Sequence, residues 1–213
     1  YPYGYRPNGI YIPRFRNVQG DDGLGFTRGY GYQGGANRIG WHELVGRTPG
    51  FGADFKNSLR TPGPWRMSLG GFGEILPYAH NTMRLHNSKK DRFGNPQVTF
   101  NFEFGDNERR HREDLVEQAA AMLEAAGATD IERYSMPMIG GAAIHEMGTA
   151  RMGHDPAEAV LNGYNQAHAA ANLFVTDGAC MTSSSCVNPS LTYMALTARA
   201  ANYAVEQLQA GAI

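Results

Sequence analysis

The strongest pattern of apolar and polar positions lies in the last quarter of the chain. Small and apolar residues occupy most sides of the segment 189–208, which predicts a long helix that is largely buried. Asn188 suits the N-cap because its side-chain oxygen accepts from free backbone N–H groups, and Pro189 suits the first helical position because it needs no N–H partner. The N-terminus of this helix would offer N–H groups and a partial positive charge to whatever binds there.

A second helix is predicted over residues 106–126. Asp106 or Asn107 can cap its N-terminus, and Gly127 fits a C-terminal stop because glycine adopts the left-handed conformation readily. The helix carries one apolar stripe, formed by Leu115, Ala119, Met122, Leu123 and Ala126. Its charged start is interpreted as a solvated face.

A period of two replaces the helical period in residues 80–104 and predicts a β-hairpin. Apolar and polar residues alternate along the second strand, so one face should be buried, namely that of Val98, Phe100, Phe102 and Phe104. The turn between the strands contains Gly94, Asn95 and Pro96, which favour turns. Further strands are predicted within 8–15, 64–78, 129–136 and 172–178.

Residues 29–34 read GYGYQG and match the dinucleotide-binding pattern G-x-G-x-x-G. That pattern binds phosphates only after a hydrophobic strand and before a helix. Phe-Thr-Arg precedes it here and two further glycines follow, so no phosphate-binding helix is expected. We interpret the segment as a glycine-rich strand and turn.

Composition limits the classes of function. The net charge is −1 and charged residues make up 18% of the 213 residues, so no nucleic acid or other polyanion is expected as a partner. No apolar run has the length of a membrane span. The opening residues lack the apolar core of a signal peptide, and localisation to periplasm or cytoplasm stays open.

The cysteines and histidines do not form a recognisable ligand set. Cys180 and Cys186 are the only cysteines in the sequence, too few for a disulfide scaffold, and we interpret them as free or structural thiols. The histidines show no spacing such as H-x-x-x-H, so no metal site is expected.

Three motifs follow one another in the last third of the chain. Residues 145–153 read HEMGTARMG, the strand after them ends at Asp177 and Gly178, and Asn188 precedes the last helix. This order resembles the C-terminal signature of the glucose-methanol-choline (GMC) family of flavin-dependent oxidoreductases. In that family, a second histidine or an asparagine precedes the helix. Several ordered motifs are a more specific signal than a single loop.

Within the family, residues 177–201 are most similar to bacterial sugar dehydrogenases, including glycoside 3-dehydrogenase types, and to relatives of pyranose oxidases. The resemblance implies FAD as cofactor and oxidation of an alcohol group of a sugar or glycoside. The electron acceptor stays open between a cytochrome, a quinone and oxygen, and a small subunit is a possible partner.

The resemblance also implies an α+β fold in two parts. Residues 1–139 would form the C-terminal portion of a substrate-binding domain, an antiparallel sheet backed by helices. Residues 140–213 would form the C-terminal strand-helix segment of a Rossmann-like FAD-binding domain. Because the phosphate-binding Rossmann half is absent from this sequence, we expect the chain to be a fragment or subunit that needs an N-terminal FAD-binding half or partner chain.

The expected chemistry assigns roles to individual residues. A flavin accepts the hydride from an alcohol carbon, while the protein supplies a base for the hydroxyl proton. Imidazole, with an ordinary pKa of about 6.5, suits that role, so His145 is the predicted base and Asn188 the residue that orients the substrate oxygen. By resemblance, the cofactor contacts are Asp177, Gly178, Asn188, Pro189 and Ser190.

Structural alternatives stand beside these roles. His145 can be a hydrogen-bonded structural residue, Asn188 only a helix cap, and Asp177 only a turn residue. A non-catalytic carbohydrate-binding module and a structural or regulatory subunit are the alternative functions. The paired His145 and Asn188 favour an enzyme, because a scaffold has no need of them.

Overall fold

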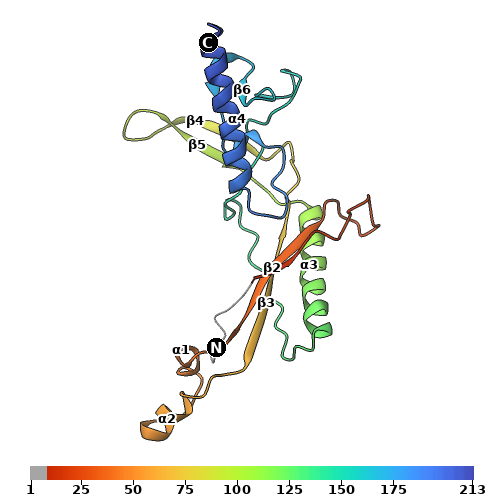
Figure 1. The fold of residues 1–213 in the computed structure, drawn as a ribbon, viewed down its shortest axis with the longest axis vertical. Helices are drawn as coiled ribbons and strands as arrows, with labels where there is room; N and C mark the ends of the chain where they lie inside the picture. The colour runs from red at the N-terminus through yellow and green to blue at the C-terminus, as the bar shows by residue number, and fades with distance from the viewer. Residues whose placement is uncertain (1–8) are drawn as a thin grey trace. The chain divides into compact units, whose positions relative to one another are not determined.

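The computed structural model describes residues 9–213 and divides into two compact units. One comprises the residues up to Gly73 together with Arg110–Ser135, and the other comprises Glu74–Arg109 with Met136–Ile213. The fold class is α+β, as predicted: the strands form small antiparallel sheets in the orders β1-β2-β3, β4-β5 and β6-β7 (Figure 1). The assignment of 1–139 and 140–213 to substrate and cofactor domains stays a prediction.

The first unit is built on three strands and one long helix. The strands are β1 (Gly9–Ile12), β2 (Tyr30–Arg38) and β3 (Trp65–Gly73), and the helix is α3 (Asp106–Ala125), whose later turns belong to this unit. The first strand falls inside the predicted 8–15, of which residue 8 lies outside the described residues. All of the GYGYQG segment except Gly29 lies in the central strand, in agreement with its interpretation as a glycine-rich strand.

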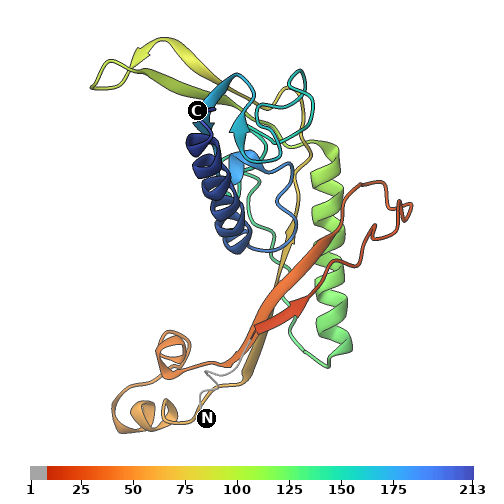
Figure 2. The ribbon, with the colours of Figure 1, turned by 45° about the horizontal axis from the view of Figure 1, so that its top comes forward.

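The core of this unit lies between the sheet and α3, which run alongside each other in both ribbon views (Figures 1 and 2). Phe26, Tyr30 and Tyr32 are buried, and the Tyr32 hydroxyl donates to the Leu115 carbonyl at 2.6 Å. The predicted stripe of α3 supplies the other side of the core, through Leu115, Ala119 and Met122. A Cβ on Gly71 would collide with the Leu115 side chain, so glycine permits this close packing.

The end of α3 follows from its sequence. Gly127 has φ +83°, and its N–H donates to the Glu124 carbonyl while that of Ala128 donates to Leu123. This pair of bonds is the Schellman arrangement that the left-handed glycine makes possible. Two short helices, α1 (Trp41–Leu44) and α2 (Gly52–Ser58), lie between β2 and β3.

One predicted strand is absent. Residues 129–136 form no strand in the structure. Asp130 has φ +55°, a left-handed conformation that interrupts an extended segment.

The predicted hairpin is confirmed as β4 (Thr82–Lys90) and β5 (Pro96–Asn101). Gly94, with φ +88°, closes the turn. The prediction of a buried apolar face is wrong for this chain, since the cross-strand partners Met83 and Phe100, and likewise Leu85 and Val98, are exposed. Alternation defines two faces of a strand, but burial requires an element to cover one of them, and the described residues leave these two cross-strand pairs uncovered.

The second unit ends with a small sheet and a helix. Strands β6 (Gln166–Ala167) and β7 (Ala170–Phe174) are followed by the 3₁₀ turn η1 (Gly178–Cys180) and by α4 (Ser190–Gln209). Leu161, Ala167 and Cys180 form the buried core, and Leu196 of α4 packs against it. The predicted last helix is thus confirmed in position.

The predicted burial of α4 is not confirmed. Ala200 is the buried residue of α4, whereas Leu191 and Met194 are 78% and 69% exposed. Val205 and Leu208 are also exposed. The described part of the chain does not cover all of the apolar surface of α4. The helix is therefore exposed although its residue pattern is typical of a buried helix.

Candidate functional site

The structure brings His145 and Asn188 together within the second unit. The His145 Nε2 atom lies 3.1 Å from the Asn188 Oδ1 atom. His145 is half-buried and Asn188 is exposed, so solvent reaches the pair. Their roles in catalysis stay predictions, but their proximity is a property of the fold.

The hydrogen bond defines which ring nitrogen is available. With Oδ1 as the acceptor, Nε2–H of His145 donates and the lone pair of a neutral ring lies at Nδ1. Reversing the Asn188 amide presents its N–H₂ group and allows Nε2 to accept instead. The amide orientation and the tautomer are therefore coupled, and a residue that controls the amide also controls the ring.

The loop that carries His145 is held against the turn η1. The N–H of Ala150 donates to the Ala179 carbonyl at 3.0 Å, and that of Met152 donates to the Cys180 carbonyl at 2.9 Å. Ala150 and Met152 also pack on the buried cluster that contains Cys180. The HEMGTARMG motif is thus fixed at its C-terminal half, and His145 lies just before that fixed part.

Gly178 lies where the backbone of this loop approaches most closely. A Cβ at this position would lie 2.7 Å from the Glu146 carbonyl oxygen and 2.8 Å from the Tyr193 hydroxyl. Only glycine avoids both contacts. The preceding Asp177 accepts a hydrogen bond from the Ala179 N–H at 3.0 Å and caps η1. The structural role of this pair is therefore visible, and its cofactor role stays a prediction.

The start of α4 differs from the prediction. Pro189 is the N-cap, with φ −95° and ψ 0°, and no side chain caps the helix at this residue. Asn188 was predicted as the cap, and this is wrong because its side-chain oxygen is bonded to His145 instead. The exposed Ser190 becomes the first helical residue. An uncapped N-terminus of a 20-residue helix thus lies directly behind the pair.

The two cysteines are free thiols. Both are buried, and Cys180 belongs to the core under η1. Burial, as the largest cause, raises the pKa of the Cys180 thiol. Both positions agree with the interpretation of free structural thiols.

Sequence reasoning missed one contact near the pair. The carboxylate of Glu74 accepts hydrogen bonds from the Ser183 hydroxyl and from the Ser185 N–H, the latter at 2.6 Å. The two serines lie 109 and 111 residues from Glu74 in sequence. No local pattern signals a contact over that separation.

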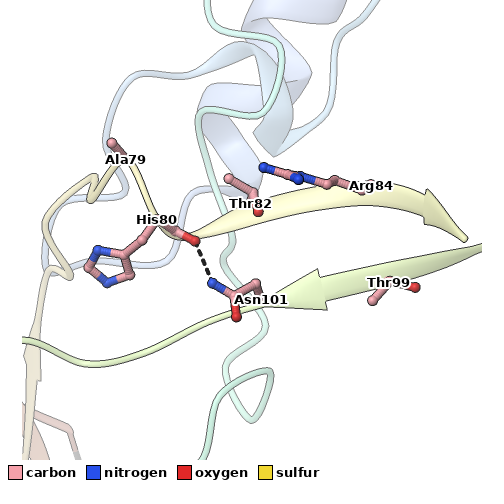
Figure 3. Close-up of a pocket in the computed structure, with 6 residues that line it drawn as sticks. All are labelled: Ala79, His80, Thr82, Arg84, Thr99 and Asn101. Atoms are coloured by element: carbon pink, nitrogen blue, oxygen red, sulfur yellow. Dashed lines mark hydrogen bonds between the residues drawn. The ribbon is translucent and has the colours of Figure 1, made fainter.

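A hollow of about 330 Å³ lies at the base of the hairpin and shares no residue with the predicted site. Figure 3 shows Thr82 and Arg84 on β4 opposite Thr99 and Asn101 on β5, and the Asn101 amide donates to the His80 carbonyl at 2.7 Å. Its lining residues are Ala79, His80, Thr82, Arg84, Thr99 and Asn101. Most of them are exposed, so the hollow is shallow surface relief.

Residues 9–213 contain no group of three or more His, Cys, Asp or Glu side chains arranged to hold a metal ion. None of their helices combines the length and apolarity needed to traverse a bilayer.

The family of the chain is established by comparison with known proteins. A family model described as GMC oxidoreductase matches residues 77–197, the region that holds the hairpin, the His145 loop and the first turns of α4. The chain therefore belongs to the GMC oxidoreductase family, as the resemblance of its motifs predicted.

Several characterised proteins are similar to it. The chain is 31% identical to 2-methyl-1,2-propanediol dehydrogenase of Mycolicibacterium austroafricanum over 86% of its length and 34% of the relative. It is 32% identical to the fructose dehydrogenase large subunit of Gluconobacter japonicus over 65% of its length and 25% of the relative. It is 33% identical to paromamine 6'-oxidase of Streptomyces fradiae over 59% of its length and 23% of the relative.

Among solved structures, pyridoxine 4-oxidase from Mesorbium loti aligns over 94% of this chain and 41% of its own, with 18% identity and a TM-score of 0.42. The chain thus spans about a third or less of the first curated relatives that it matches.

Proposed function

We propose that this chain forms the catalytic, C-terminal part of an FAD-dependent oxidoreductase that oxidises an alcohol group of a sugar or glycoside. The hydrogen bond between His145 and Asn188, in a chain of the GMC oxidoreductase family, carries the proposal. An imidazole able to accept a proton and an amide able to orient the same oxygen are the groups that alcohol oxidation requires.

The residues present fit a flavin beside this pair. The N-terminus of α4 lies behind Asn188 without a side-chain cap, so its N–H groups and partial positive charge suit an anionic ring. FAD, when bound, supplies the acceptor for the hydride of the alcohol. Pro189 and Ser190 would face the ring, and Asp177 and Gly178 the more distal part of the cofactor.

The geometry implies how a substrate would enter. In the structure, His145 and Asn188 bond to each other, so a substrate hydroxyl must replace this single bond with two. The hydroxyl would donate its proton toward the imidazole and accept from the Asn188 amide N–H₂ group. The proton then passes to the imidazole nitrogen as the alcohol carbon is oxidised, while the amide keeps the oxygen in place.

A sugar or glycoside is the substrate class supported by the relatives. Two of the three similar proteins bear names that specify fructose and paromamine, whereas a third acts on a small diol according to its name. Their shared feature is an alcohol group. Because two of these three names specify a sugar or an aminoglycoside, we propose a sugar hydroxyl as the substrate group in preference to that of a simple alcohol.

Rapid-mixing measurements of flavin reduction test the proposal in the full-length protein or assembly that contains this chain. Fructose, glycosides, aminoglycosides and 1,2-diols are the substrates to compare. His145→Ala should slow reduction by about 10²–10⁴-fold with flavin still bound, because the proton acceptor is lost. His154→Ala, which changes an exposed histidine, is the matched control.

Reduction of His145→Ala at the unmutated rate would refute the assignment of the base. A preparation that binds carbohydrate but holds no flavin, even with its full complement of chains, would favour the non-catalytic binding module instead.

A further inference from the structure

Glu74 holds the segment that leads to Asn188. Its Oε1 atom accepts from the Ser183 hydroxyl and from the Ser185 N–H at once. Hydrogen bonds to a carboxylate are stronger than those between neutral groups. One side chain thus fastens two residues of the same short segment.

The backbone of that segment is irregular. Residues 181–189 lie between η1 and α4 and form no helix or strand. Ser185 has φ +62°, a left-handed conformation that costs a non-glycine residue energy and persists only where surroundings impose it. The bond from its N–H to the Glu74 carboxylate is a charge-assisted contact that offsets part of this cost.

The anchored segment ends three residues before Asn188. Cys186 and Pro189, which flank Asn188 in sequence, are both buried. A displacement of the Ser185 backbone would therefore also displace Asn188, because only two residues separate them. The Asn188 side chain is exposed, and its Oδ1 atom pairs with the His145 ring. The orientation of the amide therefore depends on the backbone that Glu74 restrains.

We propose that Glu74 is a positioning residue for the reaction, acting through residues 183–185 to present the Asn188 amide to His145. This inference rests on the proposed function, because it assigns Glu74 a part in the same site. Glu74 itself does not touch the reacting atoms in this scheme. Its effect is to keep the amide, and with it the imidazole tautomer, in the arrangement that receives the substrate oxygen.

Hydrogen–deuterium exchange of the full-length protein tests the anchoring independently of catalysis. In Glu74→Ala, the peptide that contains Ser185 should exchange about tenfold faster or more, because its N–H loses its acceptor. Glu74→Gln keeps an oxygen acceptor and should restore most of the protection. Glu103→Ala, at an exposed glutamate of the same unit, should change nothing. Unchanged exchange in Glu74→Ala would overturn the proposal.

A double-mutant cycle tests whether Glu74 acts through Asn188. Glu74→Ala should lower the rate of flavin reduction by about 10- to 100-fold, as displacements distant from the chemistry do. In an Asn188→Ala background the same change should cost less than about twofold, because the group that Glu74 positions is gone. Glu74→Gln should recover most of the rate.

An equal loss in both backgrounds would overturn the positioning role. Failure of every alcohol to reduce the flavin of the unmutated protein would refute the proposed function and the catalytic part of this inference together. The exchange experiment would still decide whether Glu74 anchors the segment.

Discussion

The Asn188 amide can serve His145 or the helix that follows it, and the structure shows it serving His145. An N-cap needs the side-chain oxygen to face the first N–H groups of the helix. Here that oxygen faces the imidazole, and α4 begins after Pro189 without side-chain help. The residue is therefore best understood through its partner in the site.

Replacement of this residue separates the two roles. Asn188→Ala should lower the rate of flavin reduction less than His145→Ala does, because it removes an orienting group and leaves the proton acceptor. It should change the free energy of unfolding by less than about 0.5 kcal/mol, as ordinary surface substitutions do. Chemical denaturation of the full-length protein measures this, and a loss of about 1 kcal/mol or more would indicate that Asn188 caps the helix after all.

Local sequence signals identified residues whose role is local. Gly127 ends α3 through its positive φ, and Gly94 closes the hairpin turn, as their surroundings in sequence indicated. Asn188 was wrongly predicted as the helix cap because a capping signal depends only on neighbouring residues. Its side-chain oxygen instead bonds to His145, which lies 43 positions away in sequence. The contact of Glu74 with Ser185 spans 111 positions and leaves no trace in either neighbourhood.

At the scale of elements, the start of α3 depends on a buried carboxylate. Glu108 accepts from the N–H groups of Leu76 and Gly105 and from the Tyr78 hydroxyl. Desolvation by burial acts to raise its pKa, but these hydrogen bonds outweigh it and hold the pKa below its ordinary value of 4.5. Because the folded-state pKa is depressed, Glu108 stabilises the fold above the unfolded-state pKa. That contribution is lost as pH falls through the lower folded-state pKa.

Glu108→Gln should therefore destabilise the protein at neutral pH, by about 1–3 kcal/mol for hydrogen bonds to a charged group. The difference from the unmutated protein should shrink as the pH is lowered below 4.5. Urea titrations at pH 7 and at acid pH measure both values. Glu124→Gln, at an exposed position of the same helix, should show a small and pH-independent effect. A constant difference for Glu108→Gln would contradict this account.

The elements themselves were largely predictable, and their burial was not. The patterns of the hairpin and of both long helices identified β4, β5, α3 and α4 with small errors in their bounds. Phe100 and Leu191 were expected inside, yet they are 71% and 78% exposed. A sequence pattern records which face of an element is apolar, but the partner that covers that face is a property of tertiary structure.

At the scale of the whole molecule, the chain spans only part of its relatives. Its one match to a dinucleotide-binding pattern lies in strand β2 and forms no phosphate-binding turn. We therefore expect the 213-residue chain alone to retain no FAD. The absorbance spectrum of the purified chain, mixed with FAD and desalted, measures this. Stoichiometric flavin in that sample would contradict the expectation.

The buried thiol of Cys180 has a practical consequence. Cys180 is the last residue of the turn η1, whose carbonyls hold the His145 loop, and it has no exposed surface and a raised pKa. An alkylating reagent attacks the thiolate, and only where it can reach the sulfur. Modification of Cys180 would therefore require the buried cluster of Leu161, Ala167 and Cys180 to open, and the rate of alkylation would report how often it does so. The reactivity of the Cys180 thiol is therefore a built-in probe of local opening in the part of the second unit that carries His145.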